Sequence, residues 1–135
     1  MSTEGPRIRV VSAEIERSGH YLITQRRPDA VLPLLWEFPG GRVREGEDDA
    51  AALVRTLQSR VGLDVVVGEQ TMEVVHVYEG YSLTLAVYRC TSDESQEPEA
   101  RYVHAVAWVR PEQFGSYTFP GADQQTVDSL LAGVE

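Results

Sequence analysis

The sequence has no lysine, only one cysteine and no long hydrophobic run. The single cysteine, Cys90, excludes an internal disulfide and a zinc site made of several thiolates, and it fits the reducing environment of the cytoplasm. The longest apolar stretches have the length of a strand, whereas a helix that spans a bilayer needs ~20 apolar residues. The N-terminal residues contain neither the basic nor the apolar region of a secretory leader. These absences predict a cytoplasmic protein without a membrane partner.

Without lysine, arginine supplies all the permanent positive charge of the side chains. The 12 arginines are outnumbered by 21 acidic residues, so the net charge is -9. A surface with this charge repels a phosphate backbone, so a nucleic acid polymer is not an expected partner. A small phosphorylated ligand or a protein partner remains compatible with the charge. A phosphate would, however, need a local arginine cluster or a metal ion beside it.

The 135 residues suffice for one domain with a core, and neither a repeat nor a linker divides them. Apolar patterning predicts strands at residues 7–16, 21–24, 63–67, 71–78, 81–89 and 103–109. An amphipathic helix is predicted over residues 48–61, and Gly62 ends it. Its apolar stripe is predicted to consist of Ala50, Val54, Leu57 and Val61. With a second helix over residues 122–132, the sequence predicts one α+β domain, residues 1–135, with a mixed sheet.

Glycine, glutamate and arginine stand at an informative spacing in the middle of the chain. Gly41 is followed after five residues by Glu47 and after seven more by Arg55, and the pattern continues with Leu57, Gly62 and Leu63. This segment resembles the signature box of the Nudix hydrolases. The preceding run Trp36-Glu37-Phe38-Pro39-Gly40 resembles the MutT-type subgroup, whose members cleave nucleoside triphosphates to monophosphate and pyrophosphate. The resemblance implies the Nudix-type α/β/α sandwich and a nucleotide ligand.

The helix of the box lacks the acids that the resemblance leads us to expect. Members of the family hold Mg²⁺ with glutamates on one helix face, since residues at i, i+3 and i+4 lie together and Mg²⁺ prefers oxygen ligands. Here those positions are Thr56, Ser59 and Arg60. At ~4 Å and an effective dielectric constant near 20, unit charges interact by roughly 4 kcal/mol, so a guanidinium would repel a divalent ion by about 8 kcal/mol. The sequence therefore predicts that the Mg²⁺ site has been lost.

A second departure points the same way. Related enzymes carry a further glutamate before the last strand, and an ungapped alignment through Glu97-Pro98 and Trp108-Val109 places Tyr102 and Val103 at the expected Glu-His positions. Glu47 is then the one acid of the box that remains. We interpret Glu47 as a charge favoured by the helix dipole and paired with Arg55, in preference to a catalytic role.

Six residues are candidates for ligand contact: Arg26, Phe38, Gly40, Gly41, Arg60 and Asp123. The two glycines lack a Cβ and could let the chain approach a ligand closely. Phe38 either stacks on a base or belongs to the core. Asp123 lies in a segment, residues 119–123, that resembles the base-reading segment of the family, and it could alternatively cap the C-terminal helix. Arg26 lies in a Gln-Arg pair that the MutT-type subgroup also carries.

Arg60 has two interpretations. It could replace the metal in neutralising the phosphates of a ligand, with Arg26 and Arg55 assisting, because a guanidinium pairs with phosphate through two hydrogen bonds. Alternatively, it could pair with a nearby carboxylate such as Glu47 and close the cleft.

The first functional hypothesis is a MutT-like Nudix domain that has lost metal-dependent nucleoside triphosphate pyrophosphohydrolase activity. Such a domain would act as a nucleotide-binding or regulatory pseudoenzyme without Mg²⁺. The alternatives are a weakly active Nudix nucleotide diphosphatase that uses displaced acids, and a protein-interaction scaffold with a vestigial cleft.

Overall fold

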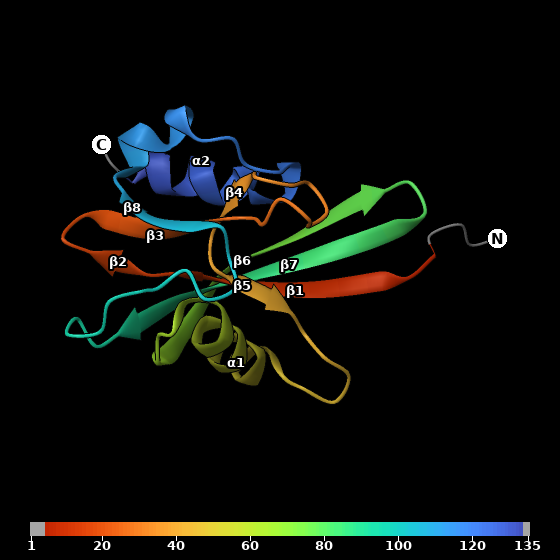
Figure 1. Ribbon diagram of the computed structural model, residues 1–135. Helices are drawn as coiled ribbons and strands as arrows, with labels where there is room; N and C mark the ends of the chain where they lie inside the picture. The colour runs from red at the N-terminus through yellow and green to blue at the C-terminus, as the bar shows by residue number, and fades with distance from the viewer. Residues whose placement is uncertain (1–4, 134–135) are drawn as a thin grey trace.

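The computed structural model describes residues 5–133, and Figure 1 shows the order and arrangement of its elements. The strands are β1 (Arg7–Glu14), β2 (Glu16–Arg17), β3 (His20–Gln25), β4 (Trp36–Glu37), β5 (Gly40–Arg42), β6 (Val65–Tyr78), β7 (Tyr81–Ser92) and β8 (Ala105–Val109). The α-helices are α1 (Asp49–Val61) and α2 (Gln124–Ala132), and the 3-10 helices η1 (Pro111–Ser116) and η2 (Gly121–Asp123) precede α2.

Two sheets lie between the two α-helices (Figure 1). The first is a 4-stranded sheet in the order β5-β1-β7-β6, in which β1 and β7 run parallel and the other neighbours are antiparallel. In the second, β3 pairs antiparallel with β2, β4 and β8. Helix α1 covers one side of this arrangement, and α2 lies on the other (Figure 1). The predicted α+β class, with a mixed sheet in an α/β/α sandwich, is confirmed.

Helix α1 begins and ends where the sequence predicts. Asp48 is its N-cap, and the carboxylate accepts a hydrogen bond of 2.8 Å from the backbone N–H of Ala51. Gly62 follows the last turn with φ of 72°, a left-handed conformation that a residue without Cβ adopts at no steric cost. These two local signals fix the length of the helix and hence which residues its end presents to the rest of the molecule.

The predicted apolar stripe of α1 is wrong at its N-terminal half. Ala50 is exposed, and Val54 is 46% exposed. The buried residues are Ala52, Leu53, Thr56, Leu57 and Val61. A search for apolar residues misses this face because Thr56 is polar. Thr56 can nevertheless be buried, since its hydroxyl donates a hydrogen bond to the carbonyl of Ala52 at 2.8 Å.

Several strand boundaries also differ from the prediction. The segments expected at residues 63–67 and 71–78 form one strand, β6, whose pairing with β7 shifts in register between Val67 and Met72. The polar residues between the two predicted strands lie at this register shift, and the strand continues through them. The strand expected at residues 7–16 divides into β1 and β2, and β4 and β5 lie in a segment for which the sequence predicts a loop.

Three buried clusters hold the layers together, and the smallest consists of Leu85, Val87 and Ala122. The largest one packs α1 against the sheets and includes Leu53, Leu57 and Val61 with Val11 and Leu22. The second lies under α2 and consists of Ile23, Phe38, Val109, Phe114 and Val127. Across residues 5–133, no helix has both the length and the apolar character needed to cross a bilayer.

Candidate functional site

A cavity of about 460 Å³ lies between the first sheet, which includes β5, and the segments around β4 and η2. Its apolar wall comes from the strands and includes Val10, Leu83, Leu85, Tyr78 and Tyr81. Polar side chains also line it: Arg26 after β3, Glu37 of β4, Arg42 of β5, Arg60 of α1 and Asp123 of η2. A largely apolar cavity of this size with a few charged groups suits a small organic ligand.

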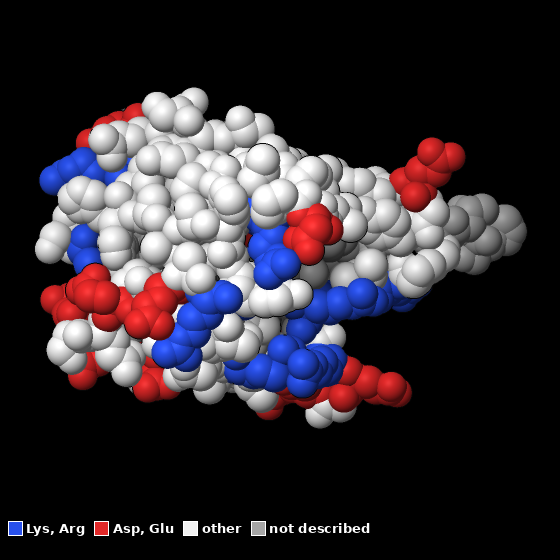
Figure 2. Space-filling view, in the orientation of Figure 1, with Lys and Arg blue, Asp and Glu red and all other residues white. Residues whose placement is uncertain are grey.

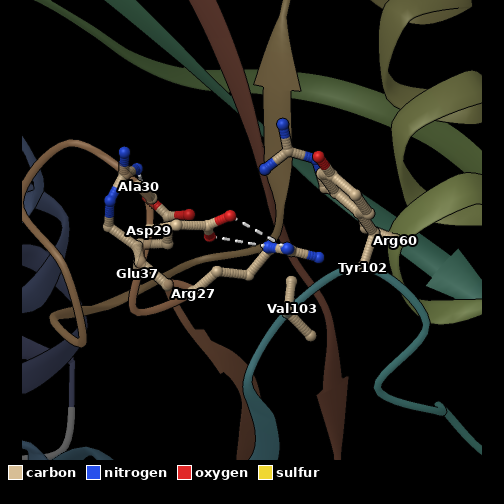
Figure 3. A pocket seen from close by; sticks show the side chains of 8 residues that line it. Arg27, Asp29, Ala30, Glu37, Arg60, Tyr102 and Val103 are labelled. Atoms are coloured by element: carbon tan, nitrogen blue, oxygen red, sulfur yellow. Dashed lines mark hydrogen bonds and ion pairs between the residues drawn. The ribbon is translucent and has the colours of Figure 1, made fainter.

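A smaller pocket of about 200 Å³ adjoins this cavity and shares Arg26, Glu37 and Arg60 with it. Arg27, Asp29, Ala30, Tyr102 and Val103 complete its lining. Figure 3 shows that Arg27 and Asp29 enter this pocket from one side, whereas Arg60 and Tyr102 reach it from the side of α1. Two pockets of different polarity therefore meet at Arg26, Glu37 and Arg60.

Gly40 and Gly41 line the larger cavity, but the atoms that lie close to them belong to other segments of this chain. A Cβ on Gly40 would lie 1.9 Å from the carbonyl oxygen of Val11, its neighbour in the sheet. A Cβ on Gly41 would lie 2.8 Å from Cγ2 of Thr56 and 3.4 Å from Nη2 of Arg60. Packing of β5 on β1 and on α1 thus explains the two glycines without any ligand.

Phe38 belongs to the core. Its side chain is 2% exposed and its ring is stacked on Phe119 with the centroids 5.5 Å apart, while Phe114 contacts it edge-on at 5.7 Å. Of the two interpretations of Phe38, the structure therefore supports burial, because one ring face is already covered. The residue contributes to the wall of the larger cavity and does not offer an open face for a base.

The face of α1 that meets Gly41 carries no carboxylate. Thr56 is 2% exposed with its hydroxyl bonded within the helix, and Ser59 is exposed with its hydroxyl 3.3 Å from the carbonyl of Thr56. Arg60 is half-buried beside Gly41. In the described part of the chain, no group of three or more His, Cys, Asp or Glu residues is placed to hold a metal ion. The residues present do not fit Mg²⁺, which needs several oxygen ligands in octahedral geometry.

Glu47 is held by Arg55, as the sequence predicts. The Arg55 guanidinium donates two hydrogen bonds of 2.7 and 2.8 Å to the Glu47 carboxylate, and the backbone N–H of Arg44 donates a third of 2.9 Å. The bonds from Arg55, followed by that from Arg44, lower the pKa of Glu47 to about 2. Arg60 does not pair with Glu47, so that alternative is wrong. Arg55 is also occupied, and lines neither of the two pockets, so the expectation that it assists Arg60 is wrong.

Arg26 lies where the two pockets meet, but its charge is compensated. Its Nη1 donates to Glu37 Oε1 at 2.9 Å and its Nε donates to the carbonyl of Val31 at 2.7 Å. The pair is mostly shielded from solvent. A ligand that met Arg26 would therefore meet Glu37 as well.

Asp123 does not cap α2, which makes the capping interpretation wrong. It occupies the N-cap position, but its side chain makes no capping hydrogen bond, and it is 6% exposed at the wall of the larger cavity. Burial raises the pKa of Asp123 well above its usual value, and the nearby charge of Glu37 raises it further, while a hydrogen bond from the backbone of Phe38 acts in the opposite direction. A protonated carboxyl can donate a hydrogen bond as well as accept one.

Comparison with known proteins agrees with the fold. The family model of the NUDIX domain matches residues 10–129. The chain belongs to the NUDIX domain family. It is 32% identical over 125 residues to a CTP pyrophosphohydrolase of Escherichia coli, a match that covers 93% of this chain and 92% of that protein. It is 28% identical over 86 residues to an 8-oxo-dGTP diphosphatase of Proteus vulgaris, covering 64% of this chain and 77% of that one.

Solved structures share the fold of this NUDIX domain. The Escherichia coli ORF135 protein superimposes with a TM-score of 0.80 at 30% identity, covering 95% of this chain and 91% of that chain. A MutT protein from Methanosarcina mazei Go1 gives a TM-score of 0.86 at 22% identity, with 99% of both chains covered. The MutT-type resemblance that the sequence suggests is therefore confirmed at the level of family and fold.

Two tyrosines in the cavity of this NUDIX domain escaped the sequence analysis. Tyr78 and Tyr81 are paired across the β6–β7 hairpin, and their rings stack with the centroids 4.9 Å apart. The sequence does indicate that they are paired. The two tyrosines flank the turn at Glu79-Gly80, and residues on either side of a two-residue turn face each other. Arg27 and Asp29 were also missed, since a loop pattern does not indicate which pocket its side chains reach.

Replacing Asp123 with asparagine is expected to stabilise the protein more at high pH than at low pH. A carboxyl whose pKa is raised on folding contributes stability below its unfolded pKa of about 4, and that contribution is lost as the pH rises through the folded pKa. The asparagine variant has no proton to lose, and its amide oxygen can still accept from the backbone of Phe38.

Urea unfolding of both proteins at about pH 5 and about pH 8 measures this difference. The gain from Asp123→Asn should be larger at the higher pH. Asp128→Asn, at an exposed position of α2, serves as the control for the loss of a surface carboxylate. Equal gains from Asp123→Asn at the two pH values would show that its carboxyl does not have a raised pKa.

Proposed function

We propose that this NUDIX domain binds a nucleotide and has lost metal-dependent hydrolysis of it, so that it acts as a nucleotide-binding or regulatory protein. The observation that carries the proposal is the face of α1 toward Gly41, where Thr56, Ser59 and Arg60 stand at the positions of the metal-binding glutamates. Two of these side chains are neutral and one is a cation, so the face would repel a divalent ion.

A nucleotide ligand is supported by the two adjoining pockets. The larger one offers an apolar wall with the stacked pair Tyr78 and Tyr81 and the buried carboxyl of Asp123, groups that can contact a base by stacking and by hydrogen bonding. The smaller one is lined by three arginines and two acids, so one positive charge is left over, and a guanidinium is a good partner for a phosphate. Two relatives, a CTP pyrophosphohydrolase and an 8-oxo-dGTP diphosphatase, are named for nucleotide substrates, which agrees with a nucleotide ligand.

Loss of hydrolysis is supported by the chemistry of the remaining acids. Glu47 is committed to Arg55 by two hydrogen bonds and lies outside both pockets. Tyr102 and Val103, which replace the downstream Glu-His pair, do line the smaller pocket, so that segment reaches the site without bringing a carboxylate. Glu37 is paired with Arg26. Cleavage of CTP by water to CMP and pyrophosphate would therefore lack the metal, and neither Glu47 nor Glu37 is an unpaired base.

Phosphorus NMR of CTP mixed with the protein and excess MgCl₂ tests both halves of the proposal. We expect the CTP resonances to shift or broaden when protein is added. We expect the resonances of CMP and pyrophosphate to grow no faster than they do without protein. The CTP pyrophosphohydrolase of Escherichia coli is the positive control. Turnover on the order of 1 per second, an ordinary enzyme rate, would contradict the loss of hydrolysis.

Weak nucleotide diphosphatase activity is the second candidate function. The observation in its favour is the 32% identity with a protein named for cleaving CTP, over 93% of this chain. Slow but metal-dependent release of pyrophosphate, abolished by EDTA, would support it. Unchanged CTP resonances together with no products would instead favour a scaffold with a vestigial cleft.

A further inference from the structure

We propose that Arg60 supplies a fixed positive charge in place of the metal, so that this chain binds the phosphates of its ligand without a divalent ion. The inference rests on the proposed function and states how the site achieves it. Four observations support it: the place of Arg60, the pairing of its neighbours, its half-buried position, and the polarity of the two pockets that it joins.

Arg60 lies where a charge on α1 can reach both pockets. It belongs to the last turn of the helix and lines the larger cavity and the smaller pocket. Its Nη2 is 3.4 Å from the point where a Cβ on Gly41 would lie, so the guanidinium occupies the space between β5 and α1. This is the face on which the family resemblance places the metal-binding acids.

The other two arginines of the smaller pocket are paired with carboxylates. Arg26 is paired with Glu37 at 2.9 Å and Arg27 with Asp29 at 3.0 Å, and both pairs belong to the smaller pocket. Among residues 5–133, Arg60 forms no ion pair with a carboxylate. Its charge therefore remains available in a protein whose net charge is -9. Figure 2 shows arginine side chains gathered on this face, between α1 and the region of β4 and β5.

The position of Arg60 makes its charge effective. Solvent and salt screen exposed charges strongly, but they screen a half-buried charge beside a cavity much less. Arginine keeps its charge at every physiological pH, and its planar fork of N–H donors matches two phosphate oxygens at once. A single residue of this kind can thus bind a phosphate that a magnesium ion would otherwise bridge.

The polarity of the two pockets orients the ligand. The larger cavity has the apolar wall and the tyrosines, whereas the smaller pocket has Arg27, whose guanidinium lies over the ring of Tyr102 at 4.4 Å from its centroid. A nucleotide whose base lies in the larger cavity extends its phosphates past Arg60 toward the smaller pocket. The pair between Arg27 and Asp29 is exposed and contributes little, so a phosphate can compete for Arg27 as well.

Calorimetric titration with CTP, in EDTA and in MgCl₂, tests the inference on the unmodified protein, on Arg60→Gln and on Arg44→Gln. Arg44 is exposed and lines neither pocket, so its variant loses the same charge away from the site. We expect the unmodified protein to bind CTP equally well in both buffers and more weakly at high salt. Arg60→Gln should raise the Kd about tenfold or more, and Arg44→Gln should change it by less than about twofold.

Cytidine and inorganic tripolyphosphate separate a phosphate contact from a general effect on the fold. We expect Arg60→Gln to weaken tripolyphosphate binding and to leave cytidine binding and the melting temperature unchanged. The inference is overturned if CTP binding requires Mg²⁺, if CTP does not bind, if Arg60→Gln binds CTP as the unmodified protein does, or if it loses cytidine equally. Release of pyrophosphate in MgCl₂ would contradict the proposed function alone, because the titrations in EDTA would still decide the role of Arg60.

Discussion

Placing three glutamates on α1 together, by Thr56→Glu, Ser59→Glu and Arg60→Glu, is expected to create a divalent-ion site on this helix. Positions i, i+3 and i+4 share one side of a helix, so their carboxylates can converge on one ion. The change also removes the cation that lies beside Gly41. Because Thr56 is 2% exposed under β5, its replacement should destabilise the metal-free variant, and its longer side chain must reach past Gly41 toward the ion.

Thermal unfolding with and without MnCl₂ measures this gain. An ion that binds only the folded state stabilises it by about 2.7 kcal/mol at a hundredfold excess over Kd, which corresponds to a rise of roughly 5–10 °C for a domain of this size. The control carries glutamine at the same three positions, with nearly the same volume and no carboxylate. The absence of a shift in the glutamate variant, or an equal shift in the glutamine variant, would mean that this face of α1 is not where the metal-binding acids have been lost.

Replacing Gly40 with alanine is expected to destabilise the protein by about 3 kcal/mol. The new Cβ would lie 1.9 Å from the carbonyl oxygen of Val11 and 2.8 Å from the Cα of Ser12. Both atoms belong to the backbone of β1, which pairs with β5 on one side and β7 on the other and so cannot move aside cheaply. The effect should appear in the free energy of unfolding, because the glycine is explained by packing within the sheet.

Urea unfolding provides the measurement, with Gly115→Ala as the matched control. A Cβ on Gly115 meets no atom within 4 Å, so this variant should stay within about 0.5 kcal/mol of the unmodified protein. If Gly40→Ala is as stable as Gly115→Ala, β5 does not pack on β1 as closely as described.

The parts of the fold that the sequence predicts well are those with local signals. Helix α1 has a capping aspartate, Asp48, and a terminating glycine, Gly62, so its bounds follow from the chain itself. Its buried face was predicted less well, because Thr56 is polar in the sequence and satisfied within the helix in the structure. The register shift in β6 depends on its pairing with β7, which no local pattern encodes.

The candidate site was predicted in part, and the errors share a cause. The spacing of the box correctly placed Glu47 with Arg55 and brought Arg60 to the cavity next to Gly41. Sequence alone could not tell whether Phe38 and Asp123 face solvent or the interior, because burial depends on segments that are distant in the chain. The contributions of Arg27, Asp29, Tyr78 and Tyr81 likewise arise only when loops and a hairpin are folded against one another.

The central claim is that the face of α1 toward Gly41 no longer holds a divalent ion. Crystals of the unmodified protein soaked in MnCl₂ test it directly, since manganese scatters anomalously and can replace Mg²⁺ at oxygen ligands. We expect an anomalous difference map without a peak between Gly41 and the side chains of Thr56, Ser59 and Arg60. A peak there, with protein oxygens at about 2.0–2.3 Å, would contradict the account and restore metal-dependent hydrolysis as the function to be explained.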